Sequence, residues 1–321
     1  MDWAKKMENE MLDLPHRHVV FTLPHQLNSL IIENKQLMFD TLFRAAADSF
    51  IDWMGYKYKL KPGIISVLHS FGETKEFHPH IHMIISWGGI NKNHYPEAIN
   101  GEYIKNEFIQ TKFRCKFQDK LVELFDDGRL QHSFSCRISF MRFLTRINKK
   151  QWRIHLEPAM RIPKEVIRYI GRYSKRACIS EHKITNINGE YISFKYKDNK
   201  NLDYNGKPMV KELTLHFTEF FPRILQHVPI PYFRLVRYYG AYAARTKAMI
   251  KQKYPLYLEK TEQENNEDQV YEMPVNPKYC TTCNKTKKYL YSTFRNRNNK
   301  IVYMTRFNPK RKDDKPNIDA A

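Results

Sequence analysis

Cysteine is scarce in this chain. Only 5 of the 321 residues are cysteine, and apart from Cys280 and Cys283 they are scattered along the sequence. An odd and scattered set provides no disulfide framework of the kind on which small secreted domains depend. The scarcity therefore argues against a disulfide-stabilised extracellular protein and favours a reducing compartment.

Long apolar runs and internal repeats are absent as well. No segment approaches the roughly 20 consecutive apolar residues that a membrane-spanning helix needs. Residues 1–14 alternate between acidic and basic side chains and contain no apolar signal core. We therefore expect a cytosolic protein that has no membrane partner.

Acidic residues are few relative to basic ones. The chain has 54 lysines and arginines against 34 aspartates and glutamates, which gives a formal net charge of +20. Such a surplus favours a polyanionic partner and makes binding weaken steeply as salt is added. Nucleic acid is the expected partner, ahead of the other common polyanion, an anionic membrane surface, which we do not expect this protein to bind.

The hydrophobic periodicity predicts a chain in which helices and strands alternate, and 321 residues are enough for a well-buried core. Short β-branched and aromatic runs predict strands at residues 18–23, 64–69, 77–86 and 152–156. Apolar residues at three- and four-residue steps predict helices near residues 39–54, 104–124, 163–176 and 236–251. A short polar loop separates the second and third strands, so we expect them to pair as an antiparallel hairpin.

The third predicted strand carries three histidines. His78, His80 and His82 occupy alternate positions, so an extended strand points all three imidazoles to one face. Imidazole suits Zn, Mn, Co or Ni, and a phosphate-cutting site can also hold Mg²⁺ or Mn²⁺ with few protein ligands. The spacing therefore predicts a metal site, with a chance arrangement on the strand surface as the alternative.

A predicted helix further along the chain carries two tyrosines. Tyr169 and Tyr173 are four residues apart, which puts their phenol oxygens on neighbouring positions of one helix surface. They border a basic stripe that we expect to contact phosphate, formed by Arg168, Arg172, Lys175 and Arg176. The alternatives are tyrosines packed at the edge of the core and a solvated basic helix face.

A metal site and paired phenols together suit the cutting and rejoining of a nucleic-acid strand. A cation polarises the scissile phosphodiester. A phenol, with a pKa of about 10, is a better leaving group than an alkyl alcohol, so a phosphotyrosine bond can be formed and reversed.

These residues resemble the motifs of a known family. His80-Ile81-His82 resembles the His-hydrophobic-His (HUH) motif, and Tyr169-Ile-Gly-Arg-Tyr173 resembles the paired-tyrosine motif of two-tyrosine HUH transposases of rolling-circle insertion sequences. The resemblance extends over about residues 15–250, with further blocks at residues 18–24, 68–73, 173–180, 194–198 and 227–240. A histidine motif ahead of the tyrosine is also the order in rolling-circle initiators, whereas relaxases place the tyrosine first.

The resemblance implies an α+β fold, the HUH-endonuclease palm, in which helices flank a central antiparallel sheet, here with a basic C-terminal extension. It implies a DNA transposase of the bacterial cytosol or nucleoid that nicks and rejoins single-stranded DNA with Mg²⁺ or Mn²⁺. Tyr169 and Tyr173 would be the nucleophiles that form 5′-phosphotyrosine links, and His80 and His82 would be metal ligands. The implied partners are single-stranded DNA, hairpins at transposon ends and the host replication machinery.

Three residues are alternatives for a third role at the metal. His69 lies on the predicted partner strand with a spacing like that of the distant histidine of relaxase sites, and it is our first choice. Glu73 resembles the acidic ligand of initiator-type sites and is the second. His78 lies about 13 Å from His82 along the strand, too far for both to bind one ion, so we expect it beside the site, supporting a ligand or contacting DNA.

Members of this family usually carry a cysteine-rich zinc-binding domain before the first strand, whereas about 15 residues precede it here. We expect either a short form or a lost start. The expected organisation is a remnant at 1–14, the HUH catalytic core at 15–180, a β-rich and helical remainder at 181–258, and a charged linker with a basic tail at 259–321. Cys280 and Cys283 resemble half a zinc knuckle, but structural zinc needs four ligands, so a degenerate remnant is the preferred interpretation over a zinc site.

Two other function classes remain open. One is a DNA-binding remnant of a transposase that has lost catalysis, and the other is a metal-dependent nuclease that activates water. A covalent protein–DNA adduct separates the transposase from both.

Overall fold

The computed structural model describes residues 11–99, 104–150, 152–158, 167, 178–204, 206–253, 292–295 and 301–304. The chain divides into two compact units, one of residues 1–100 and 104–273 and one of residues 101–103 and 274–321. In the second unit, the described strands β11 (Ser292–Arg295) and β12 (Ile301–Met304) pair antiparallel. All other described elements belong to the first unit.

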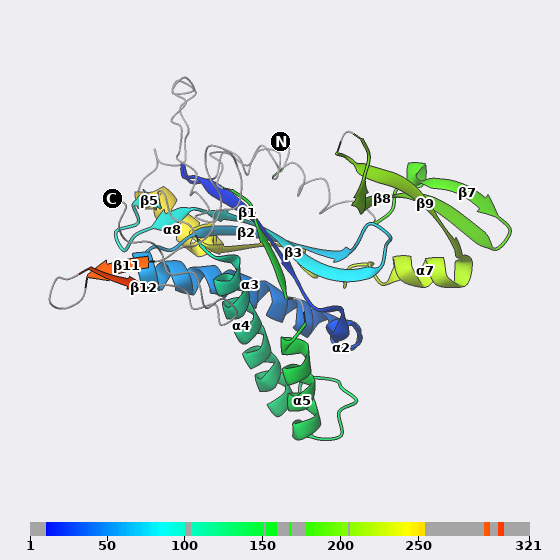
Figure 1. The fold of residues 1–321 in the computed structure, drawn as a ribbon, viewed down its shortest axis with the longest axis horizontal. Coiled ribbons are helices and arrows are strands. Elements are labelled where there is room, and N and C mark those ends of the chain that lie inside the picture. Colours follow the sequence, from blue (N-terminus) through cyan, green and yellow to red (C-terminus); the bar gives the residue numbers. More distant parts are fainter. Residues whose placement is uncertain are drawn as a thin grey trace. The chain divides into compact units, whose positions relative to one another are not determined.

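A five-stranded antiparallel sheet lies at the centre of the first unit (Figure 1). Its strand order is β10–β2–β3–β1–β6. The strands are β1 (His16–Thr22), β2 (Gly63–Phe71), β3 (Phe77–Ser86), β6 (Arg153–Leu156) and β10 (Val236–Gly240). The predicted hairpin of residues 64–69 and 77–86 is confirmed, because β2 and β3 pair antiparallel.

Helices line one face of this sheet (Figure 1). Every second residue of the strands points toward these helices. Phe21, Leu68 and Met83 are examples, and they join apolar side chains of the helices in the main hydrophobic core. These helices are η1 (His25–Leu27), α2 (Asn28–Glu33), α3 (Lys35–Tyr58) and α4 (Asn106–Asp126). The α+β fold with a central antiparallel sheet and flanking helices is therefore confirmed. None of the described helices combines the length and the apolar content that a membrane span needs.

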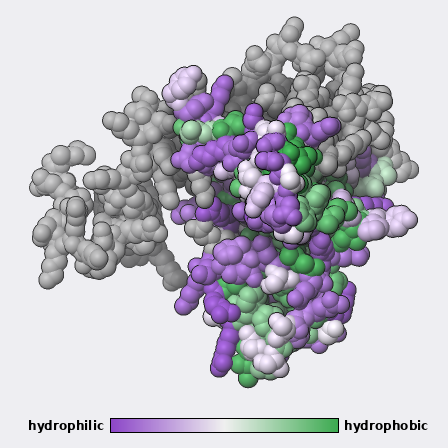
Figure 2. All heavy atoms as spheres, turned by 90° about the vertical axis from the view of Figure 1, so that its right-hand side faces the viewer, coloured by the Kyte–Doolittle hydropathy of each residue, from purple (hydrophilic) through white to green (hydrophobic). Residues whose placement is uncertain are grey.

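Helix α5 (Arg137–Asn148) forms a helical hairpin with α4. The rings of Phe125 and Phe140 stack between the two helices with centroids 4.3 Å apart, and Arg137 donates two hydrogen bonds to Asp126 at 2.7 and 2.9 Å. In Figure 2, where this hairpin lies at the bottom, hydrophobic residues are exposed among hydrophilic ones. The sequence pattern did not predict this second helix of the hairpin.

The other alternation of the strands points to the opposite face of the sheet, which we call the histidine face. Part of it belongs to a smaller apolar cluster that includes Ile65, Ile84, Ile167 and Tyr242. Further along the same strands, histidines replace the aliphatic residues. The strand pleat therefore separates the main core from the functional side chains.

A three-stranded antiparallel sheet follows in the sequence, with the order β7–β8–β9. Phe194 and Phe220 lie in its small core. Its elements are η2 (Glu181–Lys183), β7 (Ile184–Asn188), β8 (Tyr191–Leu202), β9 (Pro208–His216) and α7 (Phe217–Leu225). Two short strands, β4 (Gly88–Ile90) and β5 (Pro96–Ala98), form a further hairpin.

The prediction of a helix across residues 236–251 is wrong for its first part. Residues Val236–Gly240 form the edge strand β10, which pairs with β2, and helix α8 (Ala244–Lys253) begins only after it. The alternating pattern of Val236 and Tyr238 packs on the apolar cluster of the histidine face. Pairing with the distant strand β2 therefore overrides the local helical pattern. The chain thus returns to the central sheet after it has formed the three-stranded sheet.

Gly240 permits the turn after β10, and an alanine there is expected to destabilise the protein. Gly240 has a φ of +60°, and a Cβ atom would lie 1.8 Å from the carbonyl oxygen of Pro62. Gly128 has a φ of +65° with open space at its Cβ position, so Gly128→Ala is the matched control. We expect Gly128→Ala to lower the free energy of unfolding by about 1–2 kcal/mol through strain, and Gly240→Ala to lower it further through the clash. Urea unfolding measures both, and equal losses would contradict a role for the Pro62 contact.

Candidate metal centre

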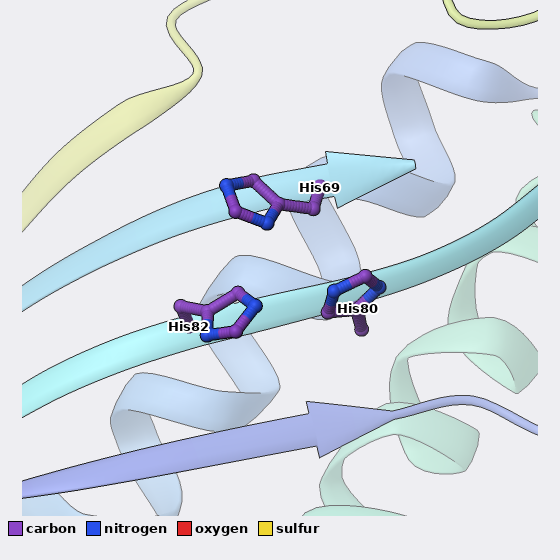
Figure 3. A group of neighbouring side chains, drawn as sticks. All are labelled: His69, His80 and His82. Atoms are coloured by element: carbon purple, nitrogen blue, oxygen red, sulfur yellow. The ribbon is translucent and has the colours of Figure 1, made fainter. Parts of the chain in front are cut away.

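Three imidazoles meet on the histidine face of the central sheet (Figure 3). His69 on β2 is the register partner of His80 on β3, and His82 lies two residues after His80. Alternate residues of a strand share a face, so all three side chains point to the same side. We call His69, His80 and His82 the histidine cluster.

The spacing of the histidine cluster fits a single cation. One ring nitrogen from each residue lies within 4.8 Å of the other two. Two nitrogen ligands at about 2.1 Å from one ion are at most about 4.2 Å apart, so a small rotation of the rings lets all three bind the same ion. Among the residues that the structure describes, no other group of histidine, cysteine, aspartate or glutamate side chains has this spacing.

Burial keeps the imidazoles of the cluster neutral. Desolvation lowers the pKa of His69 to about 3 and the pKa of His80 to about 4, and it also lowers the pKa of His82 far below its ordinary value. Neighbouring imidazoles add to the shifts of His69 and His82. An unfolded histidine has a pKa of about 6.5, so the unfolded chain binds more protons and stability falls as the pH drops from about 6.5 toward 4. At neutral pH the rings are in the form that binds metal.

A backbone hydrogen bond fixes the tautomer of His80. Its Nδ1 lies 2.7 Å from the carbonyl oxygen of His78. A carbonyl oxygen only accepts, so Nδ1 carries the proton and donates it. The lone pair of His80 is therefore on Nε2, and the ring is held in the orientation that a metal ligand requires.

A carboxylate fixes the tautomer of His82 through a second histidine. Glu157 Oε1 lies 3.1 Å from His18 Nδ1, and His18 Nε2 lies 3.0 Å from His82 Nδ1. The carboxylate accepts from His18 Nδ1–H, which leaves His18 Nε2 to accept from His82 Nδ1–H. The Glu157–His18–His82 relay therefore leaves the lone pair of His82 on Nε2. A backbone hydrogen bond of 2.9 Å from the Glu157 N–H to the His18 carbonyl oxygen supports this relay.

Loss of the carboxylate in this relay is expected to weaken metal binding. In Glu157→Ala the tautomer of His18 is no longer fixed, so His82 presents Nε2 only part of the time, and Mn²⁺ affinity should fall about 10–100-fold. His155 is exposed and its Nε2 lies 3.8 Å from Glu157 Oε1, so His155→Ala is the control and should bind Mn²⁺ normally. Calorimetric titration gives both affinities. An unchanged affinity in Glu157→Ala would show that the relay does not support His82.

The other two residues that the sequence offered for this site lie apart from the cluster. Glu73 Oε2 is 4.0 Å from Lys183 Nζ and 3.5 Å from the Lys197 backbone nitrogen, so its carboxylate faces positive charge. His78 is exposed, and its ring centroid is 5.5 Å from that of His80. The geometry favours His69 over Glu73 as the third ligand, and it gives His78 a supporting contact through its carbonyl oxygen.

The predicted nucleophiles lie outside the described residues, as do the predicted phosphate contacts and the cysteine pair. These residues are Tyr169, Tyr173, Arg168, Arg172, Lys175, Arg176, Cys280 and Cys283. Ile167, two residues before Tyr169, is described as helical and is fully buried. It belongs to the same apolar cluster as Ile65 and Ile84, which share their strand faces with His69 and His82. The chain just ahead of the tyrosines therefore lies against the histidine face.

The sequence reasoning missed His18 and Glu157. A signal for His18 was present, because His18 lies on one alternation of the first strand and the apolar Val19 and Phe21 lie on the other. No comparable signal marked Glu157, since its role depends on β6 pairing beside β1. Sheet order decides which polar residues reach the cluster.

A cavity of about 520 Å³ opens on the β1 and β6 side of the cluster. Its lining includes Thr22 and Arg153. Thr22 is the register partner of His80 in β3 and of Arg153 in β6, so the cavity lies one strand away from the imidazoles. The cavity therefore lies along β1 and β6, next to the strand that carries His80 and His82.

Comparison with known proteins agrees with the motifs. The chain is 30% identical over 247 residues to "Putative transposase y4qJ" of Sinorhizobium fredii (strain NBRC 101917 / NGR234), which covers 74% of this chain and 61% of that protein. It is 29% identical over 249 residues to "Transposase for insertion sequence element IS801" of Pseudomonas savastanoi pv. phaseolicola, with 76% and 58% covered. The chain thus spans about three fifths of the length of these relatives.

No solved structure matches the chain. The family model Y2_Tnp, described as "Putative transposase", matches residues 63–249. That range contains the strands β2 and β3 with the histidine cluster, and it also contains the two tyrosines. Because the match extends over more than half of the 321 residues, the chain belongs to the Y2_Tnp family of transposases.

Proposed function

We propose that this chain is a metal-dependent single-strand DNA endonuclease and strand transferase that acts through 5′-phosphotyrosine links in rolling-circle transposition. Membership of a transposase family supports the general activity. The observation that carries the proposal is the histidine cluster, in which three imidazoles from two adjacent strands present nitrogens within 4.8 Å of one another. Hydrogen bonds that orient the rings of His80 and His82 support this proposal.

His69, His80 and His82 would hold the cation, with Mg²⁺ or Mn²⁺ as the proposed ions. A bound cation would polarise the scissile phosphodiester and offset the charge that develops on it. The imidazole ligands favour Mn²⁺ over Mg²⁺, which prefers oxygen ligands. The protein contributes the neutral, oriented rings and the Glu157–His18–His82 relay behind them.

Tyr169 and Tyr173 would be the nucleophiles. The phenol oxygen of one tyrosine forms a bond to phosphorus while the bond from phosphorus to the 3′-oxygen breaks, and the proton that the phenol loses is balanced by the one that the 3′-hydroxyl gains. The second tyrosine would carry out the second strand transfer without release of the first end. Support comes from Ile167, which is buried in the cluster on the histidine face two residues before Tyr169.

Positive charge would hold the DNA strand at this site. We propose that Arg168, Arg172, Lys175 and Arg176 contact phosphates beside the nucleophiles. Arg153, which lines a cavity along β1 and β6, would add a further positive charge near this strand. The net charge of +20 supports a polyanionic substrate. Hairpins at transposon ends would be the DNA form recognised, and host replication would extend the free 3′-hydroxyl.

The test is a search for the covalent intermediate. The purified chain is incubated with labelled single-stranded oligonucleotides of randomised sequence and with Mn²⁺ or Mg²⁺, and the products are separated under denaturing conditions. We expect a labelled protein band that survives denaturation and disappears when the metal is chelated. Mass spectrometry of the digested adduct should then locate the nucleotide on Tyr169 or Tyr173.

Two other outcomes would overturn the proposal. Free 5′-phosphate ends with no labelled protein band would identify a nuclease that uses water. DNA retention with neither cleavage nor adduct in either metal would identify a binding protein that has lost catalysis.

A further inference from the structure

Helix α5 is rich in basic residues, and its segment of the chain contains no acidic residue. Residues 136–150, which contain α5 and the residues that flank it, include three arginines and two lysines but no aspartate or glutamate. The inner side of the helix buries Phe140, Leu144 and Ile147. The opposite side, which we call the outer face of α5, is exposed and consists of Ile138, Met141, Arg142, Thr145, Arg146 and Lys149.

The cations of the outer face lack ion-pair partners among the described residues. Arg137 pairs with Asp126 at 2.7 Å, but no described carboxylate lies within ion-pair distance of Arg142, Arg146 or Lys149. Arg142 and Arg146 are four residues apart, and like charges at this spacing destabilise a helix by about 0.2–0.5 kcal/mol. The arrangement therefore keeps a local repulsion that an external anion would relieve.

The spacing of these cations fits a polymer of phosphates. Arg142, Arg146 and Lys149 follow one line along the helix, and the seven residue steps from the first to the last span about 10 Å of helix axis. Phosphates of one strand in duplex DNA recur every 3.4 Å or so along the axis. A shallow groove of about 500 Å³ runs along the same face, with the same three cations in its lining. Several cations can thus contact one backbone at once.

The chemistry of the face favours a duplex over a single strand. Proteins that bind single strands stack unpaired bases on exposed aromatic rings. The outer face of α5 offers the aliphatic Ile138, which is 64% exposed, and Met141, which is 37% exposed, and the nearest ring, Phe143, is only partly exposed with Arg146 over it. Such a face is better suited to neutralising a backbone than to stacking unpaired bases.

We propose that the outer face of α5 is a second DNA-binding surface, which contacts the phosphate backbone of duplex DNA. This inference rests on the proposed DNA-processing function and adds a site for the duplex that adjoins the nicked strand. The α4–α5 hairpin packs on the helix side of the sheet through α3 and α4, whereas the histidine cluster lies on the other face. The surface is therefore separate from the cleavage site.

The test compares the salt dependence of duplex binding. In Arg142→Gln with Arg146→Gln, two phosphate contacts are lost, so the slope of log K against log salt for a 20-base-pair duplex should become shallower by about 1.8. The loss of affinity between 50 and 200 mM salt then becomes about tenfold smaller. Fluorescence anisotropy with the full chain measures the slope.

Matched variants separate this surface from general charge and from folding. Arg142→Lys with Arg146→Lys keeps the charge and should restore the slope. Lys57→Gln with Lys92→Gln removes two exposed cations elsewhere and should leave the slope within about 0.5 of the unmodified value, since neither is assigned a phosphate contact. An equal change in this control, or no change in the α5 glutamine variant, would overturn the proposal.

A second readout distinguishes this inference from the proposed catalytic function. The α5 glutamine variant should form the covalent adduct with a single-stranded oligonucleotide at the unmodified rate. Loss of that adduct in the variant would place α5 in the cleavage site and overturn a separate duplex surface. If the unmodified chain forms no adduct, the catalytic proposal fails, while the duplex slope still decides whether α5 binds DNA.

Discussion

His80→Ala is expected to reduce metal-dependent DNA cleavage by at least about 1,000-fold, because it removes one of the three proposed ligands in the histidine cluster. A metal ion contributes several kcal/mol of charge stabilisation to phosphoryl transfer, and about 4 kcal/mol corresponds to that factor. DNA affinity should change by less than about threefold, since the basic surface supplies most of it. Adduct formation and filter retention of the same oligonucleotide measure the two quantities.

His78→Ala is the matched control for this prediction. His78 lies two residues away on the same strand and is exposed, and its contact with the His80 Nδ1–H comes from the main chain, which the substitution retains. Cleavage by this variant should stay within about threefold of normal, because outer supporting contacts of this kind remain intact.

A metal-dependent shift in stability gives a readout that does not depend on activity. A ligand at 100 times its Kd stabilises the folded state by about 2.7 kcal/mol, so Mn²⁺ should raise the Tm of the unmodified chain and of His78→Ala but not of His80→Ala. Equal Mn²⁺ stabilisation of all three would show that the ion binds elsewhere. Normal cleavage by His80→Ala would exclude the histidine cluster as the active site.

The central part of the site was predictable because it depends on strand alternation and on one short hairpin. His80 and His82 share a face in any extended strand. A short connection between two β-patterned segments makes antiparallel pairing the simplest solution, and that pairing brings His69 opposite His80. Both conditions are local in the sequence.

The supporting part of the site was not predictable, because it depends on sheet order. The Glu157–His18–His82 relay requires β1 to lie between β3 and β6, which are far apart in the sequence. The choice between His69 and Glu73 likewise depends on where β2 ends. Glu73 lies beyond the irregularity after His69, in the turn that faces Lys183. These positions follow from long-range packing and not from spacing.

The same limit explains the error at residues 236–251. Val236 to Gly240 can be read as part of a basic amphipathic helix, and Ala244 to Lys253 is indeed helical. The strand forms because β2 offers an open edge and because Gly240 adopts a φ of +60° against Pro62, which ends the strand with a turn. A glycine in this conformation is compatible with a helix interior only as an interruption.

Replacing Tyr169 and Tyr173 together by phenylalanine is expected to abolish formation of the covalent protein–DNA adduct. Phenylalanine retains the ring but lacks the phenol oxygen that is the proposed nucleophile, so DNA affinity should change by less than about threefold. Each single variant should keep partial cleavage, because the other phenol remains. Denaturing gels measure the adduct, and the ratio between the single variants shows which tyrosine acts first.

Exposed tyrosines elsewhere provide the control for this substitution. Tyr56 is 85% exposed and Tyr204 is 97% exposed, so Tyr56→Phe with Tyr204→Phe removes two accessible phenols without touching the proposed nucleophiles. That variant should form the adduct normally. If it loses the adduct while the Tyr169 and Tyr173 double variant keeps it, the nucleophile lies elsewhere. A third result is that neither the unmodified chain nor the double variant forms an adduct, while both produce 5′-phosphate ends at the same metal-dependent rate. That result would mean that water cuts the strand at the histidine cluster.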